Sequence, residues 1–148
     1  MPECSTREFK PEDLRRVCEI ELRSFSHPYP CQLFLVYYYL FPKLFLVAEC
    51  DNLVVGYAVG VVENGDKGHL ASIAVDENYR GRGLGRALIE EFEARIKTLG
   101  VFKVYLEVSI RNEVAISLYR KLGYSVVGLL RKYYPDGEDA YLMLKELK

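Results

Sequence analysis

The residues best suited to chemistry lie in one glycine- and arginine-rich segment, residues 75–87, which reads VDENYRGRGLGRA. It follows a predicted strand and opens a predicted amphipathic helix. Glycines remove the Cβ atoms that would keep a ligand away from the backbone, and the first amides of a helix have no intrahelical partner. We therefore predict a phosphate-binding site rather than a flexible turn with solvated arginines. The glycines and arginines concerned are Gly81, Gly83, Gly85, Arg80, Arg82 and Arg86.

The glycine spacing excludes the two common nucleotide-binding loops. A Walker A loop ends in Gly-Lys followed by Ser or Thr, and that ending is missing here. A dinucleotide fingerprint has the spacing G-x-G-x-x-G, whereas these glycines follow G-x-G-x-G. The predicted ligand is therefore a phosphate compound of another class.

Two glutamates and a histidine are candidates for proton transfer. Glu107 lies in the apolar run 104–108, either as a partly desolvated base or as a solvated side chain of a half-buried strand. Glu21 lies on the apolar face of a predicted helix, where a carboxylate without partners is costly. It either orients the site or is held by a nearby amide or lysine. His69, at the start of a strand, is either a proton relay or a structural residue.

Hydrophobic periodicity and turn residues divide the chain into strands and helices that must position these side chains. Helices are expected at 11–25, 31–41, 83–99 and 112–122, and strands at 6–9, 44–50, 53–62, 69–75, 101–108, 124–130 and 140–144. The pattern predicts an α/β fold with an antiparallel front and a parallel step around the long helix.

Length and charge set limits on the class of protein. The 148 residues fit one domain, 1–148, and the net charge of −1 indicates that any anion site is local. The most apolar stretch, 33–41, is broken by Pro42 and Lys43 and is too short to span a bilayer. The first ten residues contain no apolar segment and do not form a signal peptide. We expect a cytoplasmic protein that binds neither membrane nor nucleic acid.

The cysteines are widely spaced and form no Cys-x-x-Cys pair. His27 and His69 stand in no ligand-like pattern with them, so no metal site is expected. In an intracellular protein, reduced thiols are the expected state. The four cysteines are Cys4, Cys18, Cys31 and Cys50.

Several motifs in this order resemble the GNAT acyltransferase superfamily. Residues 80–85, RGRGLG, match its R/Q-x-x-G-x-G/A signature, and 69–75, HLASIAV, resemble its preceding strand. The second half of the chain resembles the family at 105–108, 112–119 and 121–124. The segment 133–143, YYPDGEDAYLM, is similar to the end of RimI-like and archaeal N-terminal acetyltransferases, and residues 20–25 also fit that branch.

The resemblance implies a GNAT fold, with a mixed sheet of about six or seven strands flanked by about four helices. It implies an enzyme in which an amine attacks the thioester of acetyl-CoA directly. The loop amides would hold the pyrophosphate, and the backbone of the preceding strand would bind the pantetheine arm and polarise the carbonyl. The cofactor residues implied are Ile73, Ala74, Val75, Arg80, Gly81, Arg82, Gly83, Leu84, Gly85, Arg86, Asn112 and Tyr119.

By the same resemblance, Glu107 is the general base and Tyr119 the general acid toward the CoA sulfur, although Tyr119 also fits a core position. Glu21 and His69 remain rival bases. Substrate-binding residues would include the tyrosine pair that precedes the last strand and the opposite wall of a peptide groove. These substrate residues are Glu21, Phe25, Tyr29, Tyr133 and Tyr134.

The resemblance favours protein or peptide N-termini as the acceptor. A small-amine acetyltransferase and a catalytically silent acyl-CoA-binding module are the alternatives. The Leu-Pro-Glu stretch found in some archaeal relatives is missing, so no preference for acidic or small first residues follows. The chain is expected to act as a monomer or a weak dimer.

Overall fold

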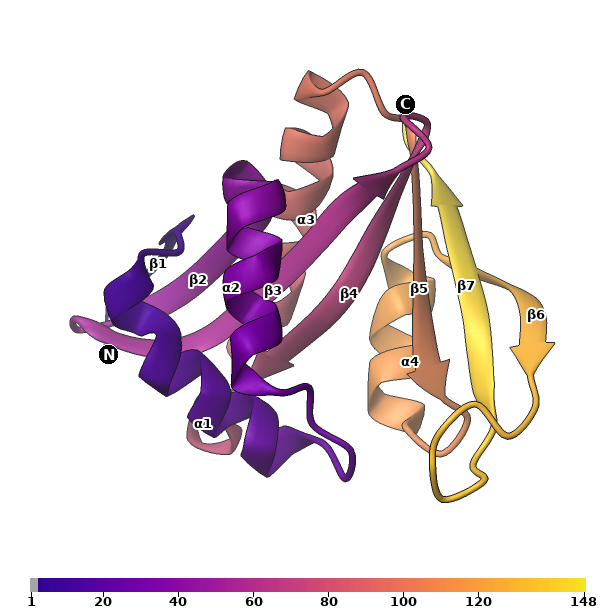
Figure 1. Ribbon diagram of the computed structural model, residues 1–148, viewed down its shortest axis with the longest axis horizontal. Coiled ribbons are helices and arrows are strands. Elements are labelled where there is room, and N and C mark those ends of the chain that lie inside the picture. Colours follow the sequence, from indigo (N-terminus) through magenta and orange to yellow (C-terminus); the bar gives the residue numbers. More distant parts are fainter. Residues whose placement is uncertain (1–2) are drawn as a thin grey trace.

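Two hairpins of long strands form the first half of the sheet (Figure 1). In this computed structural model, which describes residues 3–148, β2 (Phe45–Cys50), β3 (Leu53–Glu63) and β4 (Lys67–Val75) follow one another antiparallel. The turns between them have positive φ at both central positions, as tight hairpins require. These turn residues are Asp51, Asn52, Asn64 and Gly65.

The complete sheet has seven strands in the order β1-β2-β3-β4-β5-β7-β6. The remaining strands are β1 (Cys4–Glu8), β5 (Lys103–Ser109), β6 (Ser125–Leu130) and β7 (Ala140–Glu146). Every pair is antiparallel except β4 with β5, which are joined through a crossover helix. The predicted antiparallel front with one parallel step is confirmed.

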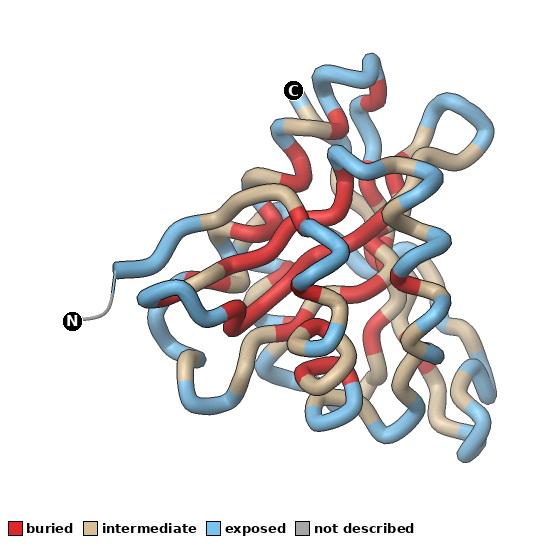
Figure 2. The backbone as a smooth tube through the Cα atoms, turned by 60° about the vertical axis from the view of Figure 1, so that its left-hand side comes forward, coloured by how far each residue is buried: buried red, intermediate tan, exposed pale blue. Residues whose placement is uncertain are grey.

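Helices cover both faces of the sheet (Figure 1). The helices α1 (Leu14–Ser24) and α2 (Cys31–Leu40) lie on one face, and α3 (Leu84–Thr98) and α4 (Glu113–Lys121) lie on the other. Strand β2 shows why both faces are apolar: Phe45 and Val47 pack on the α1–α2 side, while Leu46 and Ala48 pack on the α3–α4 side. The buried strands therefore run between two helical layers (Figure 2).

The parallel pair β4–β5 is joined at one end only. The paired residues are Gly68 with Val104 and His69 with Tyr105, and beyond them the two strands diverge (Figure 1). A register shift lies next to this point in β3, between Val59 and Gly60. A Cβ on Gly60 would lie 2.2 Å from the carbonyl oxygen of His69, so only glycine allows this approach. The divergence leaves the last residues of β4 without a strand partner on the β5 side.

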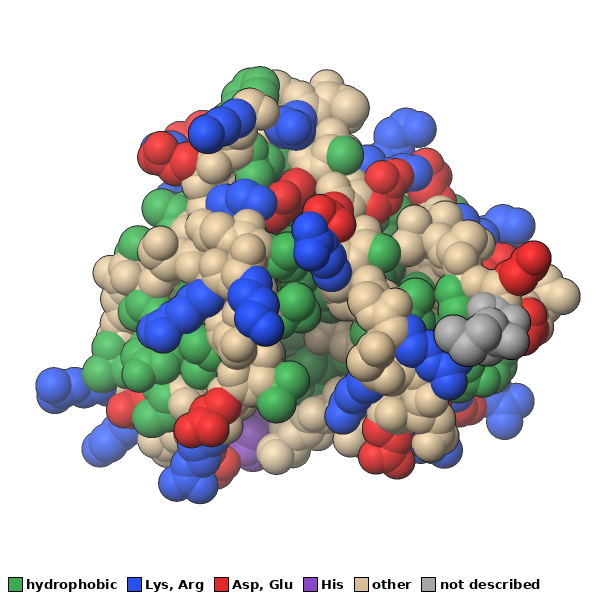
Figure 3. All heavy atoms as spheres, turned by 180° about the vertical axis from the view of Figure 1, so that it is seen from behind, with side chains coloured by type: hydrophobic (Ala, Val, Ile, Leu, Met, Phe, Trp, Pro, Cys, Tyr) green, Lys and Arg blue, Asp and Glu red, His purple; other side chains and the backbone are tan. Residues whose placement is uncertain are grey.

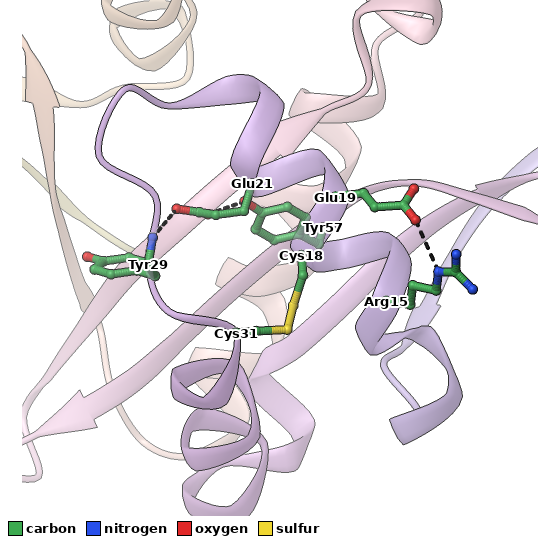
Figure 4. Close-up of a disulfide and its surroundings, with 7 residues drawn as sticks. All are labelled: Arg15, Cys18, Glu19, Glu21, Tyr29, Cys31 and Tyr57. Carbon is green, nitrogen blue, oxygen red and sulfur yellow. Dashed lines mark hydrogen bonds and ion pairs between the residues drawn. A yellow bond between two sulfur atoms is a disulfide. The ribbon is translucent and has the colours of Figure 1, made fainter.

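The cysteines are not reduced thiols, and that expectation is wrong. Disulfides join Cys4 to Cys50 and Cys18 to Cys31. Cys4 and Cys50 are opposite each other in the β1–β2 register, and Cys18 in α1 faces the first residue of α2 (Figure 4). The partners are 46 and 13 residues apart in sequence, so spacing alone did not reveal the pairs.

The predicted fold class is confirmed: a mixed seven-stranded sheet with four α-helices, matching the α/β arrangement expected. The predicted boundaries agree to within a few residues, and the first two positions of the predicted domain lie outside the described residues. Among residues 3–148, no helix is long and apolar enough to cross a membrane.

Candidate active site

The glycine-arginine loop forms an open backbone cradle between β4 and α3. Gly81 and Gly83 both have φ of 78°, a left-handed conformation that side chains rarely adopt. A Cβ on either glycine would meet no atom within 4 Å, so the backbone here is bordered by open space. The loop is tied to the end of β4 because Arg80 Nε donates a hydrogen bond to the carbonyl of Val75 at 2.9 Å.

Free amides and positive charge meet at the start of α3. Leu84 is the first residue of α3, and Gly83 before it supplies no side-chain cap. The first-turn amides are therefore available to an anion, and the helix dipole favours negative charge there. Arg82 lies over the ring of Tyr79 at 5.0 Å, and Arg86 pairs with Glu90 at 3.3 Å. These residues fit a pyrophosphate, with open backbone and positively charged side chains beside it.

Figure 3 shows the α3–α4 side of the molecule, where Lys and Arg side chains surround a recess floored by hydrophobic groups. The strand that enters the loop ends with Ile73, Ala74 and Val75. These residues pair with β3 but not with β5, so the β5-facing edge of β4 is free to accept another extended chain. An extended pantetheine arm is such a chain.

Glu107 does not point to solvent. Its side chain is 13 % exposed, and its Oε1 atom lies 2.7 Å from Nε2 of His69, which is 15 % exposed. The parallel pairing of His69 with Tyr105 places these two side chains at the point where β4 and β5 begin to diverge. The expectation of a partly desolvated Glu107 thus agrees with the geometry, and His69 is its partner.

Several tyrosines lie close enough to Glu107 for its charge to raise their pKa values. Burial raises the pKa of Tyr29, and Tyr37, Tyr133 and Glu107 raise it further. Burial also raises the pKa of Tyr133, and Glu107 and Tyr37 raise it further. Burial, then Tyr133 and Glu107, raises the pKa of Tyr134 to about 12. These phenols are therefore neutral hydrogen-bonding groups at neutral pH, and they come from both walls of the expected peptide groove.

Glu21 is buried, with 2 % of its surface exposed, and it is fully engaged (Figure 4). Its Oε2 atom accepts from the backbone amide of Tyr29 at 2.9 Å, and its Oε1 atom accepts from Ser72 at 2.7 Å and from the hydroxyl of Tyr57. The alternative that Glu21 is held by a nearby amide describes this arrangement. Glu21 orients the α1–α2 loop against β3 and β4, and Phe25, the first residue after α1, packs against the core on the same side of the sheet.

Tyr119 lies on the buried face of α4 and is 7 % exposed. Burial raises the pKa of Tyr119, and Tyr134 raises it further, so the hydroxyl keeps its proton at neutral pH. Asn112 caps α4, because its Oδ1 atom accepts from the amide of Ala115 at 3.2 Å. That interaction leaves the Asn112 NH₂ group available to a ligand.

The structure brings Glu107, His69, Tyr29, Tyr133 and Tyr134 together, and it places the loop cradle at the other end of the divergent strands. The sequence interpretation missed Glu63, Tyr37 and Tyr105, which also contact or electrostatically influence this group. Glu63 and Tyr105 lie at the paired end of β3, β4 and β5, where period-two alternation and register together would have found them. Among residues 3–148 there is no group of three or more His, Cys, Asp or Glu that could hold a metal.

Two diverging parallel strands, a phosphate cradle after the first and a carboxylate on the second fit the needs of an acyl-CoA-dependent transferase. The sequence matches the acetyltransferase (GNAT) family over residues 14–124. This chain belongs to the acetyltransferase (GNAT) family, and it is an N-acetyltransferase.

Individual relatives agree with the family. An uncharacterised N-acetyltransferase of Methanocaldococcus jannaschii is 42 % identical, with 95 % of this chain and 90 % of that protein covered. An N-alpha-acetyltransferase of Sulfurisphaera tokodaii is 40 % identical, covering 91 % and 88 % of the two chains. The crystal structure of Ard1 from Thermoplasma volcanium superimposes with a TM-score of 0.95 at 32 % identity, covering 98 % of each chain.

Proposed function

We propose that this chain transfers an acetyl group from acetyl-CoA to the α-amino group of protein N-termini. The observation that carries the proposal is the tyrosine-lined site around Glu107, at the point where β4 and β5 separate. The similarity to the N-alpha-acetyltransferases of Sulfurisphaera tokodaii and Saccharolobus solfataricus also supports an α-amino group as the acceptor. A single domain, 1–148, performs this reaction.

The donor is acetyl-CoA, which supplies the acetyl group as an activated thioester. The amides of residues 81–86 hold its pyrophosphate, with Arg80, Arg82 and Arg86 adding charge. The free edge at Ile73, Ala74 and Val75 holds the pantetheine arm, and Asn112 contributes its NH₂ group. The fit rests on the open backbone at the loop glycines and on the uncapped first turn of α3.

Removal of the ammonium proton falls to Glu107 with His69. An amine must be neutral to attack the thioester. The Glu107 carboxylate, held 2.7 Å from the His69 imidazole, can take the proton of the substrate ammonium directly or through a water molecule. Tyr119 supplies a proton to the departing sulfur from its buried hydroxyl. Tyr29, Tyr133 and Tyr134 line the groove for the first residues of the peptide, and Glu21 holds Tyr29 in place.

The test is thiol release from acetyl-CoA with a panel of short peptides that differ in the first residue. Blocked peptides carrying a free lysine and several polyamines complete the panel. Acetylation confined to free peptide N-termini is the expected result. Turnover with polyamines alone would move the function to a small-amine acetyltransferase, and acetyl-CoA binding without turnover of any acceptor would indicate a silent module.

Two variants test the assigned roles in the same assay. Glu107→Gln removes the base and Tyr119→Phe removes the acid, so each should lower kcat by about 100-fold, within the usual range for general acid–base groups. Leu22→Ala, at a side chain that is 67 % exposed on α1, is the control and should leave kcat unchanged. Unchanged turnover in both site variants would contradict the roles but not the fold.

The proposal includes a cytoplasmic location and a monomer or weak dimer. Sedimentation equilibrium over a range of concentrations measures the oligomeric state, and cell fractionation measures the location.

A further inference from the structure

Glu63, at the end of β3, approaches the ring nitrogen of His69 that Glu107 does not contact. Its Oε2 atom lies 3.6 Å from Nδ1 of His69, while Glu107 Oε1 lies 2.7 Å from Nε2. The register explains the approach: His69 is paired with Val61, and Glu63 is two residues further along the same face of β3. One imidazole is therefore placed between two carboxylates.

Tyr105 holds both Glu63 and His69. Its ring stacks on the His69 ring with centroids 4.4 Å apart and planes 5° apart, and its hydroxyl donates to Glu63 Oε1 at 2.5 Å. The Glu63 side chain is 39 % exposed, whereas His69 and Glu107 are 15 % and 13 % exposed. Glu63 is thus the most hydrated of the three side chains in the row Glu63–His69–Glu107, so an ionised carboxylate costs little free energy of desolvation there.

We propose that Glu63 is a positioning residue for proton removal from the substrate. It directs Nδ1 of His69 toward itself and Nε2 toward Glu107, and its negative charge offsets the positive charge that the Glu107–His69 pair gains. This inference rests on the proposed function, in which that pair is the base. An N–H bond of the substrate ammonium breaks and its proton is bound within the pair, and Glu63 does not accept that proton.

The charge balance around the row supports the proposal. A second carboxylate near an imidazole favours the protonated ring, as a carboxylate does in the triads that orient a catalytic histidine. The titratable or charged groups that face Glu63 and His69 come from β4, β5, α2 and the loop before β7. They are Lys67, the register partner of Glu63, and Glu107, Tyr105, Tyr37 and Tyr133. The three phenols carry no negative charge at neutral pH, so Glu63 is the carboxylate available to balance the pair.

The experiment is the pH dependence of kcat/KM for a peptide substrate at saturating acetyl-CoA, for the unmodified enzyme and for Glu63→Gln. We expect the plateau to fall about tenfold, which is less than the roughly 100-fold loss expected when an acid–base group itself is removed. We also expect the midpoint of the acidic limb to move about one pH unit lower, because a negative charge that favours protonation is gone. Tyr105→Phe keeps the stacked ring but releases Glu63, so its profile should move in the same direction by less.

Glu12→Gln neutralises an exposed carboxylate far from the site and is the matched control. A Glu63→Gln profile that superimposes on the control overturns the proposal. So does a profile that is lowered equally at every pH with an unchanged midpoint, because that result indicates a structural role only.

A second measurement separates this proposal from the proposed function. The chain has two histidines, so His27→Gln assigns the ¹⁵N signals of the His69 ring. Without any substrate, these signals should titrate at lower pH in Glu63→Gln than in the unmodified enzyme. An unchanged titration overturns the role of Glu63 alone, whereas an unmodified enzyme that acetylates no peptide overturns the proposed function and this role with it.

Discussion

The carboxylate of Glu21 accepts a hydrogen bond from the backbone amide of Tyr29 at 2.9 Å. This bond ties the loop after α1 to the helix itself, and the hydroxyl of Tyr29 reaches the carbonyl of Ala71 in β4 at 3.3 Å. A buried carboxylate on α1 and a strand carbonyl on the other side thus hold one wall of the expected peptide groove. The Glu21 carboxylate, which the sequence placed on an apolar helix face, therefore holds this wall together through its hydrogen bonds.

Replacing Glu21 should therefore destabilise the protein. Glu21→Ala leaves the amide of Tyr29 and the hydroxyls of Tyr57 and Ser72 without their acceptor in a buried place. We expect a loss of about 3 kcal/mol in the free energy of unfolding, measured by urea denaturation. Glu12→Ala, at an exposed site, should change it by less than about 0.5 kcal/mol. A loss below about 1 kcal/mol for Glu21→Ala would mean that water replaces the carboxylate easily.

A comparison of two glycines at the ends of α3 distinguishes the effect of backbone strain from the effect on cofactor binding. Gly83 and Gly100 share a φ of 78° and open surroundings, but only Gly83 lies in the loop cradle. Gly83→Ala and Gly100→Ala should each destabilise the fold by about 1 kcal/mol because of the left-handed backbone. Only Gly83→Ala should weaken acetyl-CoA binding, by about tenfold in calorimetric titration, since it moves the amides that hold phosphate. Equal affinities in the two variants would place the cofactor elsewhere.

Stability should fall at high pH because several buried phenols resist ionisation. Burial raises the pKa of Tyr57, Tyr119 and Tyr124 above the ordinary tyrosine value of about 10, with Glu21 and Glu93 adding to the effect at Tyr57 and Tyr124. The unfolded chain releases these protons near pH 10 and the folded chain does not, so unfolding becomes favoured as pH rises. The contribution of these groups is fully present below about pH 10 and is lost progressively above it.

Thermal melts between pH 8 and about pH 11 measure this loss. Tyr124→Phe removes one of the three groups and should flatten the fall above about pH 10, although it also removes the hydrogen bond to Glu93 and lowers stability at neutral pH. Tyr39→Phe, at a ring that is 89 % exposed, should follow the unmodified curve. A melting temperature that is independent of pH up to about 11 would contradict the burial of these hydroxyls.

The disulfides should contribute measurably to stability. The Cys18–Cys31 bridge closes a loop of 13 residues, for which chain entropy predicts about 3 kcal/mol. The Cys4–Cys50 bridge spans 46 residues and should contribute about 4 kcal/mol by the same reasoning. Unfolding with and without reductant, compared with the Cys18→Ser/Cys31→Ser and Cys4→Ser/Cys50→Ser variants, separates the two. Titration of the denatured protein should detect no free thiol before reduction, and four free thiols would disprove both bridges.

Part of this protein is determined by local sequence. The glycine-arginine segment carries its conformation in its own residues, because Gly81 and Gly83 allow the left-handed backbone and the start of α3 leaves free amides. Strand alternation and turn pairs such as Asn64-Gly65 likewise determine hairpins locally, so the α/β order was predictable.

Only the tertiary structure decided which distant side chains meet. Cys4 and Cys50 became partners through the β1–β2 register, and Glu21 found its donors on the α1–α2 loop, β3 and β4. Glu63, His69 and Glu107 come from three strands, and their distances depend on a register shift at Gly60 and on the short β4–β5 pairing. The physical reason is that a shift of one residue in register turns every side chain of a strand to the other face. Residue type can suggest a base, but register decides whether it has a partner.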